Sequence, residues 1–279
     1  MFHKLFGFIG IMLMLAGQVM AQDSTFTVGS WNVESGGADP HTIAEQLGEF
    51  DTVDVWGFVE VGSDADAELF EIGAETARGT EFSRVVSESG DEDRLAIVYN
   101  SERFELIDSD ELDYINPTGR LRSPLVAMFK DTVSGREFAF MVNHLKSKTD
   151  PDSRRERNEQ SQLLNEWARD AAEYGLPVIA VGDYNYYYET DGSRYERGLD
   201  ILTAEGVFEW VEPEELVLTQ CTVDGNRCAF NSVVDFVFVS GEAQTWNGTS
   251  EIIVRDGDVP DDEQTSDHRP VLARFEISN

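Results

Sequence analysis

The sequence predicts an α/β fold, a four-layer α/β sandwich in which two packed, mixed β-sheets are flanked by helices. Three observations predict it. Short apolar runs with strand character recur along the chain, amphipathic helical patterns lie between some of them, and several apolar runs follow one another directly. A barrel of strict strand–helix repeats would need a helix after every strand. We therefore expect two facing sheets with helices on their outer sides.

The expected strands are rich in Val, Ile, Leu and Phe and are separated by connections rich in Gly, Asp and Asn. In chain order they are residues 26–31, 53–59, 95–99, 125–129, 138–142, 178–181, 234–239, 252–254 and 271–275. The acidic connections 88–93 and 256–263 are expected to be surface loops. The first of these would oppose direct contact with a nucleic acid unless a metal ion intervenes.

Three segments have the periodicity and end signals of helices. Residues 40–47 begin with a proline suited to a first turn, and residues 64–77 are amphipathic. Residues 153–174 begin at Ser153, the expected N-cap, and end before a Gly-Leu-Pro sequence. No low-complexity linker or fixed-period repeat divides the chain, so residues 22–279 are expected to form one domain.

The first residues indicate export. A short basic start is followed by a nearly continuous apolar run at 5–15, and the small residues before and at Ala21 suit signal peptidase. A membrane anchor is the alternative, but the apolar run is shorter than the ~20 residues that span a bilayer. We expect residues 1–21 to be a signal peptide and the protein to be secreted or periplasmic, monomeric and without stable membrane association.

The chain is strongly acidic, with a formal net charge of -33 that becomes -34 when residues 1–21 are removed. Such a charge repels polyanions, so a nucleic-acid substrate would need locally basic groups or bridging cations. Acidic residues are scattered along the whole chain, which favours the alternative that the surface suits a saline environment.

Cys221 and Cys228 are the only cysteines and lack the Cys-x-x-Cys spacing, so we expect a local disulfide.

Polar side chains suited to acid–base or metal chemistry stand at the ends of expected strands. They are Asn32, Glu60, His144, Asp183, Asn185, Asp235, Asp267 and His268. Asp183 and Asn185 are two residues apart and so share one face of an extended segment. Asp235 lies within an apolar run, where burial costs several kcal/mol unless the charge is held. His268 is its natural partner.

The donor types favour Mg²⁺, which is held by one or two carboxylates with water and substrate completing its shell. Glu60 with Asp267 or Asn32 would suffice. Histidine does not suit Mg²⁺, so His144 and His268 remain for proton transfer. Zinc is the alternative metal, but two histidines without a free cysteine are fewer ligands than a zinc site usually has. Taken singly, each of these residues also fits a turn, a cap or a satisfied core position.

In combination, these segments resemble the endonuclease/exonuclease/phosphatase superfamily, which has the deoxyribonuclease I-like fold. The segments are Trp31-Asn32, Val59-Glu60-Val61, Asn143-His144, Gly182-Asp183-Tyr184-Asn185, Val234-Asp235-Phe236 and Ser266-Asp267-His268-Arg269-Pro270. The resemblance extends from about residue 26 to residue 275. It implies a divalent-metal-dependent phosphoester hydrolase, with Mg²⁺ expected and Mn²⁺ or Ca²⁺ as alternatives.

The resemblance also implies a role for each matching position. Glu60 matches the metal-binding glutamate, Asn32 lies beside metal and phosphate, and Asp267 matches the acid beside the metal. Asp183 and Asn185 match the pair that positions the attacking water and the phosphate. Asp235 matches the acid that orients the last histidine, and His268 matches the histidine that activates water or contacts the phosphoryl group.

Two further positions resemble only some branches of the superfamily. His144 resembles the second histidine of the deoxyribonuclease and sphingomyelinase branches, with Asp93 as its acid partner, and would protonate the departing oxygen. Arg122 resembles an arginine that contacts substrate phosphate; the alternative is a solvated arginine at a strand start. In deoxyribonuclease I a basic residue follows the metal-binding glutamate, whereas residues 62–66 here carry two acids and no base.

The substrate is accordingly the open question. We expect a nuclease acting on nucleic-acid phosphodiester bonds. The alternatives are a phosphomonoesterase or a lipid phosphoesterase of the same superfamily, and a non-catalytic binding module. Basic residues at 146–157 form either a phosphate track or an ordinary helix start, and the tyrosines at 184 and 186–188 either stack on bases or pack in the core.

Overall fold

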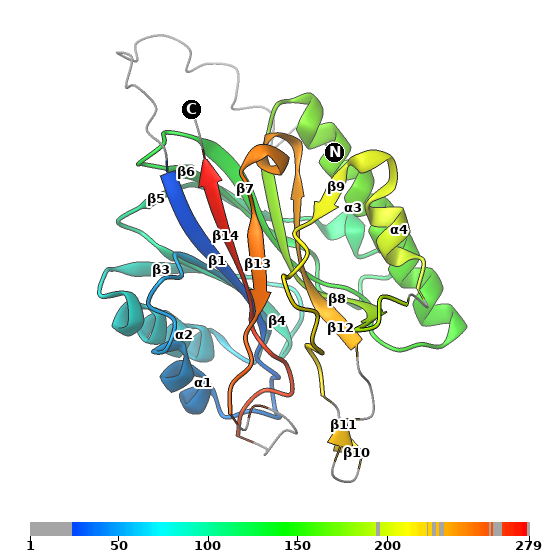
Figure 1. The fold of residues 1–279 in the computed structure, drawn as a ribbon, viewed down its shortest axis with the longest axis horizontal. Coiled ribbons are helices and arrows are strands. Elements are labelled where there is room, and N and C mark those ends of the chain that lie inside the picture. The colour runs from blue at the N-terminus through cyan, green and yellow to red at the C-terminus, as the bar shows by residue number, and fades with distance from the viewer. Residues whose placement is uncertain are drawn as a thin grey trace.

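Two six-stranded mixed β-sheets pack face to face with helices on their outer sides (Figure 1), which confirms the predicted α/β sandwich. The computed structural model describes residues 24–193, 196–221, 223–224, 227–228, 232–256, 258 and 264–277. The expected signal peptide and most of the 256–263 loop lie outside these residues. Among the residues described, no helix is both long enough and apolar enough to cross a membrane.

The first sheet has β1 near its centre, paired with β2 in parallel and with β14 antiparallel. Its strands, in spatial order, are β13 (Thr249–Ile252), β14 (Val271–Ile277), β1 (Ser24–Asn32), β2 (Val55–Val61), β4 (Arg94–Asn100) and β3 (Phe82–Val86). The parallel pair brings the carboxyl ends of β1 and β2 to the same edge of the sheet, because parallel strands run in one direction.

The second sheet contains the other parallel pair, β7 with β8. Its spatial order is β5 (Phe104–Glu111), β6 (Leu125–Asp131), β7 (Glu137–His144), β8 (Val178–Glu189), β12 (Ser232–Ser240) and β9 (Phe208–Trp210). A separate hairpin of β10 (Val223–Asp224) and β11 (Arg227–Cys228) carries the Cys221–Cys228 disulfide, which confirms the expected pairing.

The helices cover the outer faces of the two sheets (Figure 1). α1 (Pro40–Leu47) and α2 (Asp64–Arg78) pack on the first sheet, and α3 (Pro151–Glu173) lies on the second with α4 (Gly198–Leu202) against it. The expected Ser153 cap was wrong. Asp150 is the N-cap of α3, because its side chain accepts the backbone N–H groups of Asp152 and Ser153, and a proline occupies the first turn.

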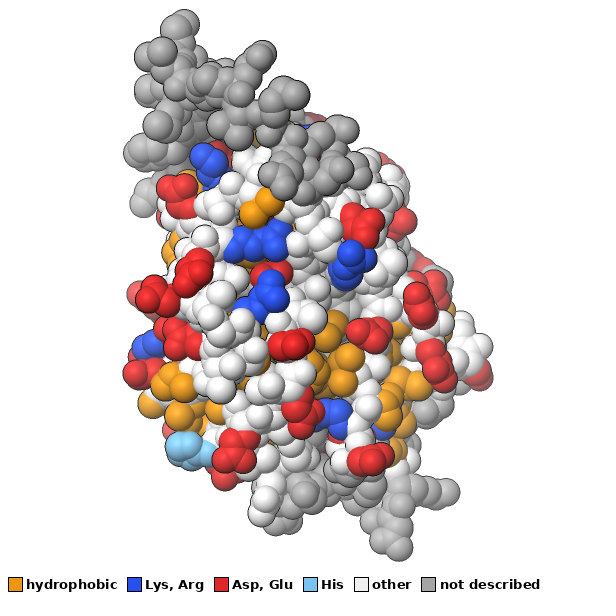
Figure 2. Space-filling view, turned by 60° about the vertical axis from the view of Figure 1, so that its left-hand side comes forward, with side chains coloured by type: hydrophobic (Ala, Val, Ile, Leu, Met, Phe, Trp, Pro, Cys, Tyr) orange, Lys and Arg blue, Asp and Glu red, His pale blue; other side chains and the backbone are white. Residues whose placement is uncertain are grey.

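Two apolar layers hold the molecule together. The larger lies between the sheets and under α3, and is rich in aromatic side chains such as Phe26, Phe104 and Phe138. The smaller lies between the first sheet and helices α1 and α2. On the face shown in Figure 2, acidic side chains are scattered over the surface and not gathered in one patch. This distribution agrees with the scattered acids of the sequence.

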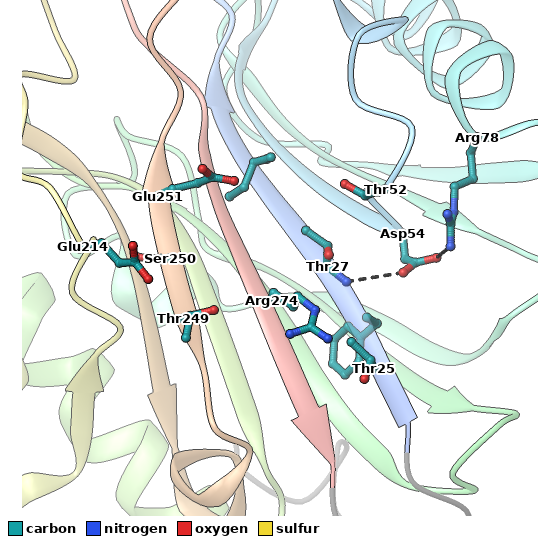
Figure 3. Close-up of a pocket in the computed structure, with 12 residues that line it drawn as sticks. Thr25, Thr27, Thr52, Asp54, Arg78, Glu214, Thr249, Ser250, Glu251 and Arg274 are labelled. Atoms are coloured by element: carbon teal, nitrogen blue, oxygen red, sulfur yellow. Dashed lines mark hydrogen bonds and ion pairs between the residues drawn. The ribbon is translucent and has the colours of Figure 1, made fainter.

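A buried charged network ties the two sheets together at the start of β1. Arg103 lies between two buried carboxylates, 3.4 Å from Asp54 and 3.3 Å from Asp131. It also donates to the Thr25 carbonyl at 2.7 Å, and its guanidinium lies over the rings of two core phenylalanines. Asp54 is held further by Arg78 at 3.0 Å, beside a polar surface hollow of about 470 Å³ (Figure 3).

Candidate active site

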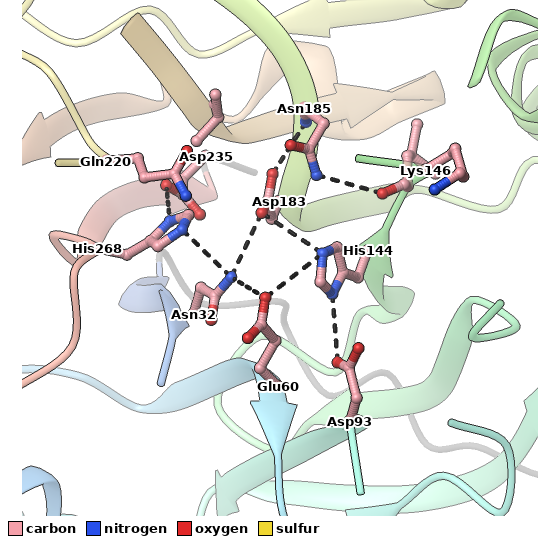
Figure 4. Close-up of polar contacts among 12 residues, drawn as sticks. Asn32, Glu60, Asp93, His144, Lys146, Asp183, Asn185, Gln220, Asp235 and His268 are labelled. Atoms are coloured by element: carbon pink, nitrogen blue, oxygen red, sulfur yellow. Dashed lines mark hydrogen bonds and ion pairs between the residues drawn. The ribbon is translucent and has the colours of Figure 1, made fainter. Parts of the chain in front are cut away.

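The predicted residues converge at the end of β1 that lies opposite this network (Figure 4). Asn32 ends β1, Glu60 lies near the end of β2, and the register pairs His144 at the end of β7 directly with Asp183 in β8. Gly182 allows that close pairing: a Cβ there would lie 2.0 Å from the Asn143 carbonyl oxygen. The two parallel strand pairs therefore deliver an amide, two carboxylates and an imidazole to one place.

His268 and Asp235 form a buried, hydrogen-bonded pair. The His268 Nδ1 lies 2.8 Å from Asp235 Oδ2, the partnership expected from the acid within an apolar run. Burial alone lowers the pKa of His268, but the charges of Asp235 and Asp267 outweigh it and raise that pKa well above its ordinary value. With Nδ1 directed at Asp235, Nε2 faces the centre of the site.

Asn32 lies at the centre and links the two sides of the site. Its Nδ2 donates to Glu60 Oε1 at 2.9 Å and to Asp183 Oδ2 at 3.3 Å, and lies 3.4 Å from His268 Nε2. Its Oδ1 accepts the backbone N–H of Glu34 at 3.0 Å. In this orientation the Asn32 amide points its N–H groups at the centre of the site. Glu60 and His268 both contact this amide nitrogen.

His144 is surrounded by acids that stand beyond ordinary hydrogen-bond length. Its Nε2 lies 3.7 Å from Glu60 and 3.6 Å from Asp183, and its Nδ1 lies 3.5 Å from Asp93. Burial is the main cause that lowers the pKa of His144 well below its ordinary value, and Arg122 adds to it. Arg122 itself is paired with Asp93 at 3.0 Å.

Asp183 and Asn185 share the face that points into the site, as their spacing predicted. The Asn185 backbone N–H donates to Asp183 Oδ1 at 2.9 Å, and its side-chain amide donates to the Leu145 carbonyl at 3.2 Å. Burial, followed by the nearby charge of Asp235, raises the pKa of Asp183 to about 8. An acid with such a pKa is one that a bound cation would readily convert to its charged form.

Asp267 lies on the His268 side of the site. Its Oδ1 is 3.5 Å from His268 Nε2, its Oδ2 accepts from Gln220 Nε2 at 3.4 Å, and its backbone N–H donates to Glu34 at 2.8 Å. Of the predicted ligands, Glu60 has the clearer place: ligand atoms of Glu60, His144 and Asp183 lie within 4.8 Å of one another. Two carboxylates and one imidazole at that spacing fit a divalent cation.

Sequence reasoning missed two residues that support the His268–Asp235 pair. Thr219 is fully buried, and its Oγ1 accepts the backbone N–H groups of Val234 at 2.9 Å and Asp235 at 3.2 Å. Gln220 forms a β-bridge with His268 and lines the cleft. No motif marks either residue, since their roles arise where a connecting segment crosses the start of β12.

The site opens into a cleft of about 500 Å³, whose walls include Glu60, Arg122, His144, Lys148, Asp183 and Tyr187. The basic segment after His144 is not a continuous phosphate track. Arg157 is fully buried and paired with Glu196 at 3.0 Å, and of the basic residues of that segment only Lys148 is both exposed and at the cleft. Three of the four tyrosines, at 184, 186 and 188, are core residues.

Comparison with known proteins agrees with this geometry. The sequence profile described as the Endonuclease/Exonuclease/phosphatase family matches residues 29–268, a range that holds every predicted site residue. A search of curated proteins finds no match.

Solved structures show the same fold at low sequence identity. A Bacteroides thetaiotaomicron protein described as an endonuclease/exonuclease/phosphatase family protein is 18% identical, with a TM-score of 0.68, covering 92% of this chain and 97% of its own. TDP2 of D. rerio, solved with a single-strand DNA product, is 18% identical, with a TM-score of 0.68 and coverage of 91% and 100%. A mannosyl-6-phosphatase of B. thetaiotaomicron is 19% identical, with a TM-score of 0.64 and the same coverage.

Proposed function

The chain belongs to the endonuclease/exonuclease/phosphatase family, whose members hydrolyse phosphoester bonds, and we propose that it is an exported, divalent-metal-dependent nuclease. The observation that carries the proposal is the pair of histidines that flank Asp183 in one cleft, His268 on one side and His144 on the other. A phosphodiester releases an alkoxide, so its hydrolysis gains from one group that accepts a proton from water and a second that donates to the leaving oxygen.

The two pKa shifts set the protonation of the free site: burial keeps His144 neutral, and the charges of Asp235 and Asp267 keep His268 protonated. The proposed reaction uses the opposite form of each imidazole, a neutral His268 whose Nε2 accepts a proton from water and a protonated His144 that donates to the leaving oxygen. Asp235 stabilises the imidazolium that forms at His268. Asp183 aligns the water, while Asn32 and Asn185 hydrogen-bond to phosphoryl oxygens. Glu60 and Asp267, with Asn32 beside them, are the proposed ligands of Mg²⁺, with Mn²⁺ or Ca²⁺ as alternatives, and Asp183 lies close to Glu60. The ion would stabilise the charge that develops on the phosphoryl oxygens.

Two features support a nucleic-acid substrate. Arg122 and Lys148 stand on the walls of the cleft, where they offer positive charge to phosphate in a chain that is otherwise acidic. TDP2 of D. rerio, which shares the fold, was solved with single-strand DNA.

A phosphomonoesterase is the second candidate, because an acidic hollow adjoins the cleft. Glu88, Asp91 and Asp113, together with one further cation, Arg120, line about 450 Å³ of space that shares the Asp93–Arg122 pair with the cleft. Carboxylates accept hydrogen bonds from hydroxyl groups and repel a second phosphate, so this wall favours a small hydroxyl-rich ester. The mannosyl-6-phosphatase with this fold fits that description.

A metal-dependence panel tests the proposal. The chelator-treated protein is assayed with Mg²⁺, Mn²⁺ or Ca²⁺ on plasmid DNA, single-stranded DNA and RNA, sphingomyelin and a hexose 6-phosphate. We expect metal-dependent cleavage of nucleic acid, retained by the control variant His41→Ala, whose side chain is exposed on α1. Hydrolysis of the lipid or the sugar phosphate alone would overturn the nuclease, and no hydrolysis at all would favour a binding module.

We also propose that residues 1–21 direct export and are removed. Expression of the full chain in a bacterial host should give a periplasmic protein that begins at Gln22 by mass spectrometry. An intact N-terminus on the exported protein would contradict this.

A further inference from the structure

The face of β8 that carries the site does not end at Asn185. Side chains alternate along a strand, and Tyr184, Tyr186 and Tyr188 on one face are buried. Tyr187 follows Asp183 and Asn185 on the other face and lines the same cleft. It is therefore the third residue in a row of which the first two belong to the proposed catalytic centre.

Tyr187 is held in place by groups that do not depend on substrate. The Arg157 guanidinium lies over its ring at 5.6 Å, and this arginine is fully buried. Arg157 also donates to the Lys148 carbonyl at 3.0 Å, and the backbone of Lys148 hydrogen-bonds to the Tyr187 hydroxyl. Tyr187 has a φ of 47°, in the left-handed region that a bulky side chain rarely adopts. A surrounding structure that imposes this conformation also fixes the ring's position.

We propose that Tyr187 and Lys148 form a nucleotide subsite of the cleft, in which the ring stacks on a base next to the cleaved phosphate and the ammonium group contacts a neighbouring phosphate. The subsite rests on the proposed nuclease function and narrows it to single strands. A base inside a duplex is already stacked on both sides, whereas a single strand offers an open π-face to an aromatic side chain. An ammonium group on the wall of the same cleft as the ring would contact a phosphate of the same strand.

An oligonucleotide that lacks bases tests whether Tyr187 stacks on a base. KM and kcat are measured on a single-stranded DNA oligonucleotide and on an oligonucleotide of equal length made only of abasic units. We expect Tyr187→Ala to raise KM on the normal strand by about 5-fold to about 150-fold, the range of base–aromatic stacking. On the abasic strand, which has phosphates and no bases, Tyr187→Ala and the wild type should have equal KM.

Three further variants separate stacking from structure. Tyr187→Phe retains the ring and should stay within about threefold of wild-type KM, because stacking does not use the hydroxyl. Tyr174→Ala removes an exposed tyrosine at the C-cap of α3 and should change nothing. Lys148→Gln should reduce the slope of log KM against log salt by about 0.7, the value for one single-strand phosphate contact. Thermal unfolding checks that each variant is folded, and Tyr187→Leu replaces Tyr187→Ala if that variant is not.

The outcomes distinguish this subsite from the proposed function. Equal losses for Tyr187→Ala on both strands, or a loss with Tyr187→Phe as large as with Tyr187→Ala, would show that Tyr187 only braces the loop at Lys148. An unchanged salt slope would remove Lys148 from the subsite. Wild-type protein that cleaves neither strand under any metal would instead overturn the nuclease proposal itself.

Discussion

The two ends of β1 both bury charge, and they treat it differently. At the start of the strand, Arg103 lies between Asp54 and Asp131, and each carboxylate has a cation or hydroxyl partner at 3.4 Å or less. At the other end, His144 has three acids around it at 3.5 to 3.7 Å, and its Nδ1 has no hydrogen-bond partner among the residues that the structure describes. The Arg103 end is matched, in that each buried charge has a partner within hydrogen-bond distance, and such pairing holds a fold together. The His144 end is mismatched, in that ionisable groups crowd a cleft without such pairing, which is typical of a reactive site.

The largest expected effect comes from breaking the matched end. Arg103→Ala leaves two buried carboxylates without their shared cation, which costs about 3 to 5 kcal/mol of unfolding free energy. Urea unfolding measures the loss. At a temperature where the variant is folded, its kcat should equal that of the wild type, because the network lies at the opposite end of β1 from the site.

The control for this variant is Arg136→Ala, which breaks an ion pair with Glu242 that is well exposed on both sides. Exposed pairs of this kind contribute about 0 to 1 kcal/mol. An equal loss of stability in the two variants, or a fall in kcat with Arg103→Ala, would erase the distinction between the two ends.

Breaking the mismatched end should show the reverse pattern. His268→Ala and His144→Ala are each expected to lower kcat by at least about 100-fold, the low end for a general acid or base. His144→Ala should lower the unfolding free energy by less than Arg103→Ala does, whereas His268→Ala also leaves the buried Asp235 without its partner and carries a stability cost of its own. Near-wild-type turnover of a nucleic acid by either purified variant would remove that histidine from the mechanism.

The sequence predicted the strands that are buried and missed those that form edges. β3, β5 and β9 each end a sheet, and β5, for example, alternates poorly and carries four acids among its eight residues. Such strands are held by backbone hydrogen bonds to one neighbour, and burial leaves little pattern in their side chains. β13, another edge strand, was expected three residues too late, at 252–254.

The predictability of the site divides in a similar way. Polar residues at the ends of apolar runs indicated Glu60, His144 and Asp183, and an acid within an apolar run indicated Asp235. These signals are local in sequence. Thr219 contacts the site only through backbone groups distant in sequence, at a connection with no pattern of its own. A residue of this kind is visible only once the chain is folded.

Replacing Thr219 should lower both stability and activity, and each by less than the changes above. The register between β8 and β12 shifts next to Asp235, at Val234. The Thr219 hydroxyl oxygen accepts hydrogen bonds from the backbone N–H groups of both residues. Thr219→Val retains the shape and removes the acceptor, so it should cost about 1 to 3 kcal/mol of unfolding free energy. Because Asp235 moves with its backbone, kcat should also fall, by about tenfold for an interaction of 1.4 kcal/mol, with KM little changed.

Rescue distinguishes positioning from general destabilisation. Thr219→Ser retains the acceptor and should recover most of kcat even if the lost methyl group lowers stability, because it is the hydroxyl that holds the backbone at Asp235. The pH profile of kcat provides the second readout. Displacing Asp235 from His268 lowers the pKa of His268 toward its ordinary value. The limb of the profile that reports His268 should therefore move to lower pH in Thr219→Val and return to the wild-type position in Thr219→Ser. A Thr219→Val variant that loses stability while keeping both kcat and the wild-type profile would make Thr219 part of the scaffold alone.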